Sequence, residues 1–275
     1  MCGTSLDSVD ISIINTVGKK FKVFGFKEYQ LSQKLKDKIN HLKSSKPTNI
    51  EVNNFNTEIT TLIISQIKNI LKKYKLDKSD ISAIGYAGIT LDHRPDLKKS
   101  LYLGDPKMFA SILSIPIISD FRQTDIDAGG QGAPLTGLFH KYLNTVMKKS
   151  LIYLNLGGFA NVSIPDKSKL MSYDTGPANY LIDAWCREKF DIEFDLNGRL
   201  ASMGEIDSEV LKLMLKDKYF IKKPPKSTGF ELFNMSWVKE HLKKTSFSRD
   251  INILATLTYL TVITVSNDIN KYRSK

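Results

Sequence analysis

The sequence predicts an α/β protein, in which strands and helices alternate along the chain and pack on one another. Two apolar runs rich in β-branched and aromatic residues, 9–14 and 21–26, predict an antiparallel hairpin near the N-terminus. Two Lys-rich stretches with apolar residues at helical spacing, 32–42 and 57–74, predict amphipathic helices that pack on a sheet. With 41% hydrophobic residues, the 275-residue chain can bury a large core.

The rest of the chain continues this alternation. We expect short strands at 81–86, 100–103 and 115–119 and a helix over 106–112. A helix over 135–147 and a strand pair at 151–156 and 161–164 come next, followed by a turn at 174–179. Further helices are expected from this turn through Lys189, over 205–216, after Gly229 and over 250–269. The Gly-rich run 128–134 predicts a boundary between two domains, residues 1–127 and 128–275.

Composition excludes several classes of protein. The formal net charge is +11, but the lysines are scattered and lack the interleaved aromatic residues of a base-stacking surface, which argues against nucleic acid. The longest apolar run, 251–265, is broken by Asn252 and four threonines, which argues against a membrane span. Cys2 and Cys186 are too few for a disulfide framework, so we expect a reducing, cytoplasmic compartment.

Small residues, hydroxyls and two carboxylates gather in the turn before the first strand. This segment consists of Gly3, Thr4, Ser5, Leu6, Asp7, Ser8, Val9 and Asp10. Backbone amides in such a turn can point at phosphate oxygens, and a carboxylate such as Asp7 can hold magnesium through water. Similar turns are common before strands, so an ordinary turn remains the alternative.

Two polar segments at predicted strand ends are candidates for substrate binding, because open α/β sheets place ligands there. Thr90 lies in a polar cluster that ends at Pro95, and a turn with a helix cap from Asp92 is its alternative. Arg122 lies in a Gly- and Asp-rich loop, 119–134, and can clamp a carboxylate with two parallel hydrogen bonds. An interdomain hinge explains the glycines of this loop but not the arginine.

The second half has two further candidates. Gly157 and Gly158 form either a tight hairpin turn or a second phosphate clamp, with Asn161 close behind them. Asp174 stands before a predicted helix, where it is either the N-cap or a general base at a strand end. Spacing alone leaves both alternatives open.

Taken together and in this order, the motifs resemble the anhydro-N-acetylmuramic acid kinase family over nearly the whole chain. They are GTSLDSVD, SLYLGDP, ISDFRQTDIDAGGQGAPL, LNLGGFANVSIP, YDTGPANYLIDAW, FDLNGRLA and PPKSTGFELFN. The resemblance implies a two-lobed, actin/hexokinase-like (ribonuclease H-like) fold that closes on ATP and substrate. It also implies ATP and Mg²⁺, and the conversion of 1,6-anhydro-N-acetylmuramate and water to N-acetylmuramate 6-phosphate in cell-wall recycling.

The resemblance also assigns roles to residues. It implies that Asp174 takes a proton from the attacking water and that Gly3–Asp10 binds ATP phosphates. Thr90 and Arg122 fall on sugar-contacting positions, while Gly157, Gly158 and Asn161 resemble a second nucleotide loop. The partner expected is therefore a small anhydro amino sugar.

The chain departs from the family pattern in residues and in length. At five positions this chain has a different residue from the one that is usual in the family. They are Ser8, Ala87, Ile89, Ala178 and Phe230. We expect the fold to be incomplete at both ends, without a preceding strand and a Gly-rich adenosine segment. The last helix would then expose apolar residues and favour association, such as a homodimer. Two alternatives are a catalytically silent sugar-binding paralogue and an ATPase or chaperone of actin-like fold.

Overall fold

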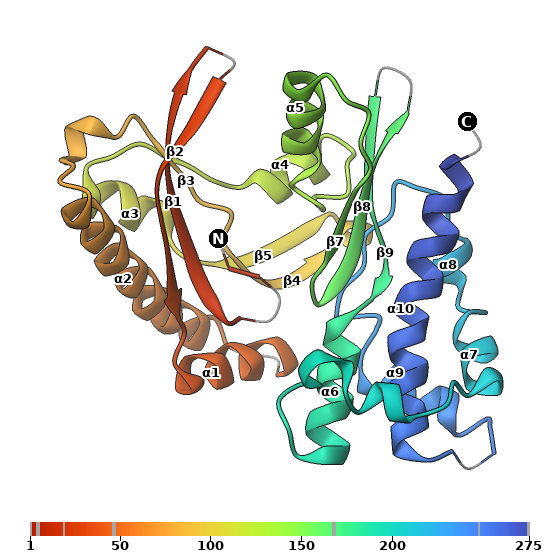
Figure 1. The fold of residues 1–275 in the computed structure, drawn as a ribbon. Coiled ribbons are helices and arrows are strands. Elements are labelled where there is room, and N and C mark those ends of the chain that lie inside the picture. The colour runs from red at the N-terminus through yellow and green to blue at the C-terminus, as the bar shows by residue number, and fades with distance from the viewer. Residues whose placement is uncertain are drawn as a thin grey trace. The chain divides into compact units, whose positions relative to one another are not determined.

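The computed structural model describes residues 2–3, 6–18, 20–45, 48–166, 169–246 and 248–273. Contacts divide the chain into two compact units, Met1–Ala128 and Gly129–Lys275. The predicted domain boundary falls one residue earlier, between residues 127 and 128. Both units combine helices with small sheets, so the chain is a mixed α/β protein (Figure 1). No helix among the described residues is long and apolar enough to cross a membrane.

The first unit begins with a long antiparallel hairpin, which confirms that prediction. Strand β1 (Ser8–Val17) pairs with β2 (Lys20–Gln30), and the register slips once, between Ile13 and Ile14. Two helices follow, α1 (Gln33–Ser44) and α2 (Asn49–Lys73), where amphipathic helices were predicted. Helix α2 begins with a capping box: the Glu51 amide donates to the Thr48 hydroxyl, and the Thr48 amide donates to the Glu51 carboxylate.

The rest of the first unit consists of short elements. Two sheets are present among the described residues, a parallel pair and an antiparallel pair. The strands are β3 (Ile84–Gly85) with β6 (Ile117–Ile118), and β4 (Ile89–Arg94) with β5 (Lys99–Leu103). The helices are α3 (Pro106–Leu113) and α4 (Phe121–Asp127), with single 3₁₀ turns η1 (Lys78–Asp80) and η2 (Pro95–Leu97).

The sequence interpretation of this region is corrected at two places, the turn considered as an alternative up to Pro95 and the predicted loop 119–134. Residues 89–94 form a strand rather than a turn, because their backbone pairs with β5 through Thr90↔Tyr102 and Arg94↔Lys99. Residues 121–127 form helix α4 rather than a loop. Gln123 ties this helix to the strands, since its side chain accepts a hydrogen bond from the Ser100 amide and donates to the Lys98 carbonyl.

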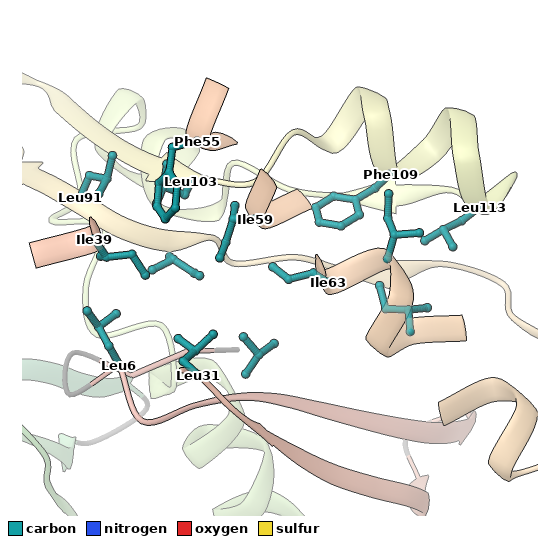
Figure 2. Packing of buried hydrophobic residues seen from close by; sticks show 14 of the residues in the cluster. Leu6, Leu31, Ile39, Phe55, Ile59, Ile63, Leu91, Leu103, Phe109 and Leu113 are labelled. Carbon is teal, nitrogen blue, oxygen red and sulfur yellow. The ribbon is translucent and has the colours of Figure 1, made fainter. Parts of the chain in front are cut away.

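The core of the first unit is formed by apolar side chains from its helices and strands. Ile39 of α1, Ile59 of α2, Leu103 of β5 and Phe109 of α3 are at most 1% exposed (Figure 2). Leu6, which precedes β1, reaches the same cluster. The N-terminal turn is therefore attached to the core by a buried side chain.

The second unit is built on a three-stranded antiparallel sheet. Its strands are β7 (Tyr153–Leu156), β8 (Phe159–Asp166) and β9 (Lys169–Pro177), in the order β7-β8-β9. Helix α5 (Gly137–Met147) precedes the sheet. The helices after the sheet are α6 (Asn179–Phe190), α7 (Ser208–Met214), α8 (Lys218–Ile221), α9 (Met235–Leu242) and α10 (Asp250–Arg273), with 3₁₀ turns η3 (Leu196–Gly198) and η4 (Ala201–Met203).

Helix α10 is the central helix of this unit, contrary to the expectation that it lacks partners. Ile253, Leu254, Leu257 and Leu260 are at most 2% exposed, and they pack in one cluster with Trp185 of α6. Further along α10, Ile269 packs against Val162 and Tyr173 of the sheet. The apolar residues that were expected to favour association are therefore largely covered within the unit.

Candidate functional site

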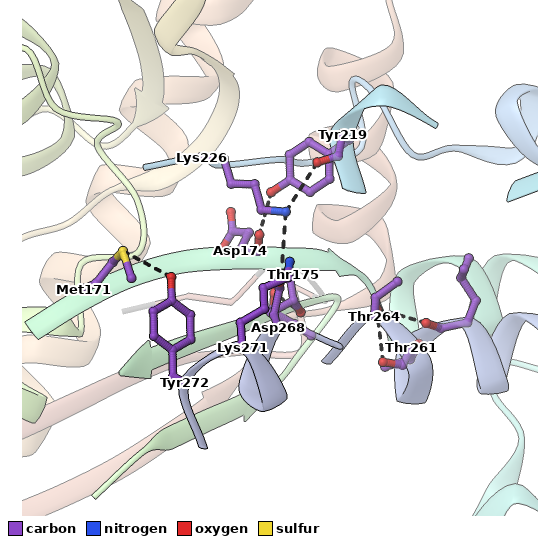
Figure 3. Close-up of polar contacts among 12 residues, drawn as sticks. Met171, Asp174, Thr175, Tyr219, Lys226, Thr261, Thr264, Asp268, Lys271 and Tyr272 are labelled. Atoms are coloured by element: carbon purple, nitrogen blue, oxygen red, sulfur yellow. Dashed lines mark hydrogen bonds and ion pairs between the residues drawn. The ribbon is translucent and has the colours of Figure 1, made fainter. Parts of the chain in front are cut away.

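Asp174 lies in strand β9, and this residue is 6% exposed. The Thr228 amide donates to its Oδ2 at 3.0 Å, and the Asp174 amide donates to the Lys226 carbonyl at 3.2 Å. The Tyr219 hydroxyl donates to the Asp174 carbonyl at 2.7 Å (Figure 3). Helix α6 starts after Ala178, so the alternative of Asp174 as its N-cap is wrong.

The tyrosine beside Asp174 is neutral. Burial raises the pKa of Tyr219, and the nearby charges of Asp174 and Asp268 raise it further. The Tyr219 hydroxyl therefore keeps its proton and stays a donor to the Asp174 backbone. Asp174 is held at its amide, its carbonyl and its side chain at once, which leaves the carboxylate little freedom to change direction.

Strand register places a row of polar residues across the sheet. Asn161 of β8 pairs with Asp174 of β9 on one side and with Asn155 of β7 on the other. A register shift between Ala160 and Asn161 in the β8–β9 pairing brings Asn161 opposite Asp174. Side chains directly opposite on neighbouring strands lie on one face of a sheet, roughly 5 Å apart at Cβ. The structure thus brings two predicted site residues together and adds Asn155, which the sequence interpretation did not select.

Gly157 and Gly158 form the turn between β7 and β8, so the hairpin prediction is confirmed. The Gly158 carbonyl accepts from the amides of Ala178 and Tyr180, and the Gly157 carbonyl accepts from that of Asn179. An added Cβ at Gly157 would meet only ordinary contacts, the nearest at 3.6 Å. Packing inside the unit therefore does not itself require glycine at this position.

The N-terminal turn of the first unit is described in part, because Thr4 and Ser5 lie outside the described residues. The Leu6 amide donates to the Gly3 carbonyl at 3.1 Å, and Leu6 adopts a left-handed φ of 58°. This backbone is costly for a leucine, and burial of its side chain holds it in place. Val9 is also buried.

The carboxylates of this turn differ in their partners. The Asp7 side chain is 64% exposed and lies 3.3 Å from the Lys36 ammonium. Asp10 instead accepts a short hydrogen bond from the Ser8 hydroxyl, at 2.5 Å. A carboxylate this exposed can be reached by a hydrated cation, so Asp7 fits that role. No group of three His, Cys, Asp or Glu side chains that could hold a metal ion is present in the described part of the chain.

Thr90 and Arg122 belong to neighbouring parts of the first unit. Thr90 of β4 pairs with Tyr102 of β5, and the Tyr102 hydroxyl donates to Asp120 at 2.7 Å. Asp120 is the residue before α4, and Arg122 lies in the first turn of that helix. Burial and the bond to Asp120 raise the pKa of Tyr102 to about 12, so it remains a donor. Tyr102 therefore links the two segments.

The departures from the family pattern fit their surroundings in the two units. Ile89 is 2% exposed in the first core, and Phe230 has its ring centroid 6.5 Å from that of Tyr180. Ala178 is buried at φ −137°, outside the left-handed region, so an alanine there carries no such strain.

Several residues around Asp174 were not predicted to belong to the site. Tyr219, Lys226, Thr228 and Asp268 are 45 to 94 positions away in the chain, counted as 219 − 174 and 268 − 174. Segment 223–229 overlaps the motif PPKSTGFELFN, but on residue types alone its composition indicated only a turn. Asp268 was marked only by its charge within a largely apolar helix.

Comparison with known proteins gives the family. The family model described as anhydro-N-acetylmuramic acid kinase matches residues 1–275. The chain belongs to this family. A protein of that name from Sulfurovum sp. is 37% identical over 99% of this chain and 76% of its own length. Those from Hahella chejuensis and Vibrio vulnificus are 36% and 31% identical, and the matches cover 75% of each. Membership makes this chain a kinase, that is, a phosphotransferase.

Proposed function

We propose that this chain converts 1,6-anhydro-N-acetylmuramate, ATP and water to N-acetylmuramate 6-phosphate and ADP, with Asp174 as the general base. The family and the names of its relatives supply the substrate. The observation that carries the role of Asp174 is its buried carboxylate, held by the Thr228 amide at 3.0 Å and by two backbone contacts. A base works best when its direction is fixed before the substrate arrives.

In the proposed reaction, the Asp174 carboxylate accepts a proton from a water molecule. The water oxygen attacks the anomeric carbon, and the bond from that carbon to the bridging oxygen breaks. The freed oxygen at C6 then receives the γ-phosphoryl group, and ADP leaves. Asn155 and Asn161, in the same row as Asp174, can direct amide groups at the sugar or at the water.

The proposal assigns the remaining predicted residues to the two substrates. Residues 3–10 bind ATP phosphates through the backbone of the turn, and Gly157 and Gly158 with Asn161 form the second nucleotide loop. Thr90 and Arg122 bind the sugar, for which Arg122 offers a planar set of donors that fits a carboxylate. Asp7 would hold Mg²⁺ through water, and the metal would supply charge neutralisation at the phosphates.

The proposal extends to fold and setting. The two units correspond to the lobes of an actin/hexokinase-like (ribonuclease H-like) fold, and each has strands and a core of its own. The partner is a small anhydro amino sugar, and the reaction takes place in the cytoplasm as a step of cell-wall recycling. The two reduced cysteines support a reducing compartment.

The deciding experiment is to incubate the protein with 1,6-anhydro-N-acetylmuramate and Mg-ATP in ¹⁸O-water and to analyse the sugar by mass spectrometry. We expect one ADP per sugar phosphate formed, and one ¹⁸O on C1 with none in the phosphate. ADP release without a sugar phosphate would indicate an ATPase instead. Sugar binding without ADP release would indicate a silent binding protein, and either result rejects the proposal.

A further inference from the structure

A buried lysine, Lys226, lies next to the proposed base. Among the residues that the structure describes, the buried charged side chains are Asp174, Lys226 and Asp268, and all three belong to one cluster of the second unit. Lys226 is 1% exposed, so a substrate does not reach its ammonium. A buried charge is costly unless it is paired and hydrogen-bonded, so its position needs a compensating benefit.

The Lys226 ammonium is held on several sides. Its Nζ lies 3.7 Å from Asp268 Oδ2 of helix α10 and donates to the Tyr219 carbonyl at 3.3 Å (Figure 3). It also lies 4.6 Å from the ring centroid of Tyr219 and 5.8 Å from that of Tyr173. Burial lowers the pKa of Lys226, and the carboxylate of Asp268 opposes this change.

The backbone of the same lysine contacts Asp174. The Lys226 carbonyl accepts from the Asp174 amide, and two residues later the Thr228 amide donates to the Asp174 carboxylate. Segment 226–228 therefore holds the proposed base at its backbone and at its side chain. The charges of Lys226 and Asp174 also attract each other, which favours the ammonium and the ionised carboxylate together.

We propose that Lys226 is a positioning residue for the phosphotransfer reaction. Its ammonium, anchored by Asp268, fixes segment 226–228 against Asp174 and stabilises the ionised form of that carboxylate. This inference rests on the proposed role of Asp174 as the base. According to this inference, the reaction requires a protonated Lys226 in addition to the base.

Other titratable groups face this cluster from three elements. Tyr173 of β9 and Tyr219 of α8 are neutral, because burial and the charges of Asp268 and Asp174 raise their pKa values. From α10, Lys271 contacts the second oxygen of Asp268, and Tyr272 donates to the sulfur of Met171. The Lys271 side chain is 55% exposed. Lys226 is therefore the cation of this group that solvent does not screen.

The test compares Lys226→Met with Lys189→Met, measuring kcat and KM against pH. Lys189 is a matched control, because it also pairs with an aspartate of α10, Asp250 at 3.8 Å, and lies 5.2 Å from an aromatic ring centroid, that of Trp185. For Lys226→Met we expect kcat to fall about tenfold and the acidic limb of the profile to move up by about one pH unit. KM for ATP and the profile of Lys189→Met stay unchanged.

Two further variants separate charge from packing. Lys226→Arg keeps the charge, so its acidic limb stays at the wild-type pH even if the larger side chain lowers kcat. Asp268→Asn removes the carboxylate that keeps Lys226 protonated, so the alkaline limb moves to lower pH. If Lys226→Met fails to fold, the alkaline limb of Asp268→Asn tests the proposed role of Lys226 instead.

The inference is overturned by a Lys226→Met enzyme with unchanged kcat and pH profile, by the same limb shift in Lys226→Arg, or by an unmoved alkaline limb in Asp268→Asn. Failure of the proposed function looks different. In that case Asp174→Asn keeps its activity, or no sugar phosphate forms with the unaltered protein.

Discussion

At the scale of single residues, the fold fixes the direction of the Asp174 carboxylate while one of its oxygens binds the Thr228 amide. Asparagine is nearly the same size and can still accept that hydrogen bond through its side-chain oxygen. It cannot take a proton from water. The change Asp174→Asn therefore separates the chemistry of this position from its contribution to the fold.

We predict that Asp174→Asn lowers kcat by about 10²- to 10⁴-fold, the usual contribution of a general base. Thermal unfolding should stay close to that of the unaltered protein, because the backbone contacts of the residue remain. Asp191→Asn is the control: this exposed residue ends helix α6 with a left-handed φ of 53°, a conformation that asparagine adopts readily. Turnover of Asp174→Asn equal to that of the control would rule out the base.

The sequence singled out Asp174 but not the residues that hold it. Asp174 stands at a predicted strand end, before a predicted helix, and this position marked it as a candidate. Thr228 contributes a backbone amide, which every residue except proline has, so its type carries no signal. Lys226 and Asp268 come together only because β9, segment 226–228 and α10 pack in one unit. Contacts of this kind depend on tertiary structure and cannot be predicted from the composition of a short segment.

At the scale of elements, long periodic segments were predictable and short ones were not. Helices α2 and α10 carry apolar residues at helical spacing over more than five turns. A strand or a loop does not bring residues with this spacing onto one face, so the pattern indicates a helix. Strand β4 and helix α4 have six and seven residues, too few for a clear period. Both are stabilised by partners instead, β4 by pairing with β5 and α4 by the hydrogen bonds of Gln123.

Helix α2 offers a direct test of how much its buried face contributes. Ile59 is fully buried in the first core, whereas Ile50 of the same helix is 72% exposed. We predict that Ile59→Ala lowers the free energy of unfolding by about 2–5 kcal/mol, because it removes buried methyl groups and leaves a cavity. Ile50→Ala should change it by less than about 0.5 kcal/mol.

Urea unfolding followed by far-UV circular dichroism measures both variants under one set of conditions. The two substitutions remove the same atoms from the same helix, so the comparison cancels differences in helix propensity. Equal destabilisation by both variants would show that α2 does not pack through the face on which Ile59 lies.

At the scale of the whole molecule, each unit has its own hydrophobic core. The first core takes its described members from residues between Cys2 and Ile117, and the largest core of the second unit takes them from Phe159 to Leu260. The Gly-rich run around residue 130 marked this division in the sequence, and contacts divide the chain after Ala128. Strand pairing within each unit was less predictable beyond the two hairpins, because it depends on contacts that are distant in the chain.

Separate cores imply that each unit responds to its own substitutions. Both tryptophans of the chain, Trp185 and Trp237, are buried in the second core, so tryptophan fluorescence reports unfolding of the second unit alone. We predict that Leu257→Ala, which removes a buried side chain of this core, lowers the urea midpoint seen by fluorescence. The cost is about 2–5 kcal/mol. Ile59→Ala should leave that midpoint within error and lower only the circular dichroism transition of the first unit. A fluorescence midpoint that moves equally in both variants would mean that the units unfold together, and the two cores would then act as one cooperative structure.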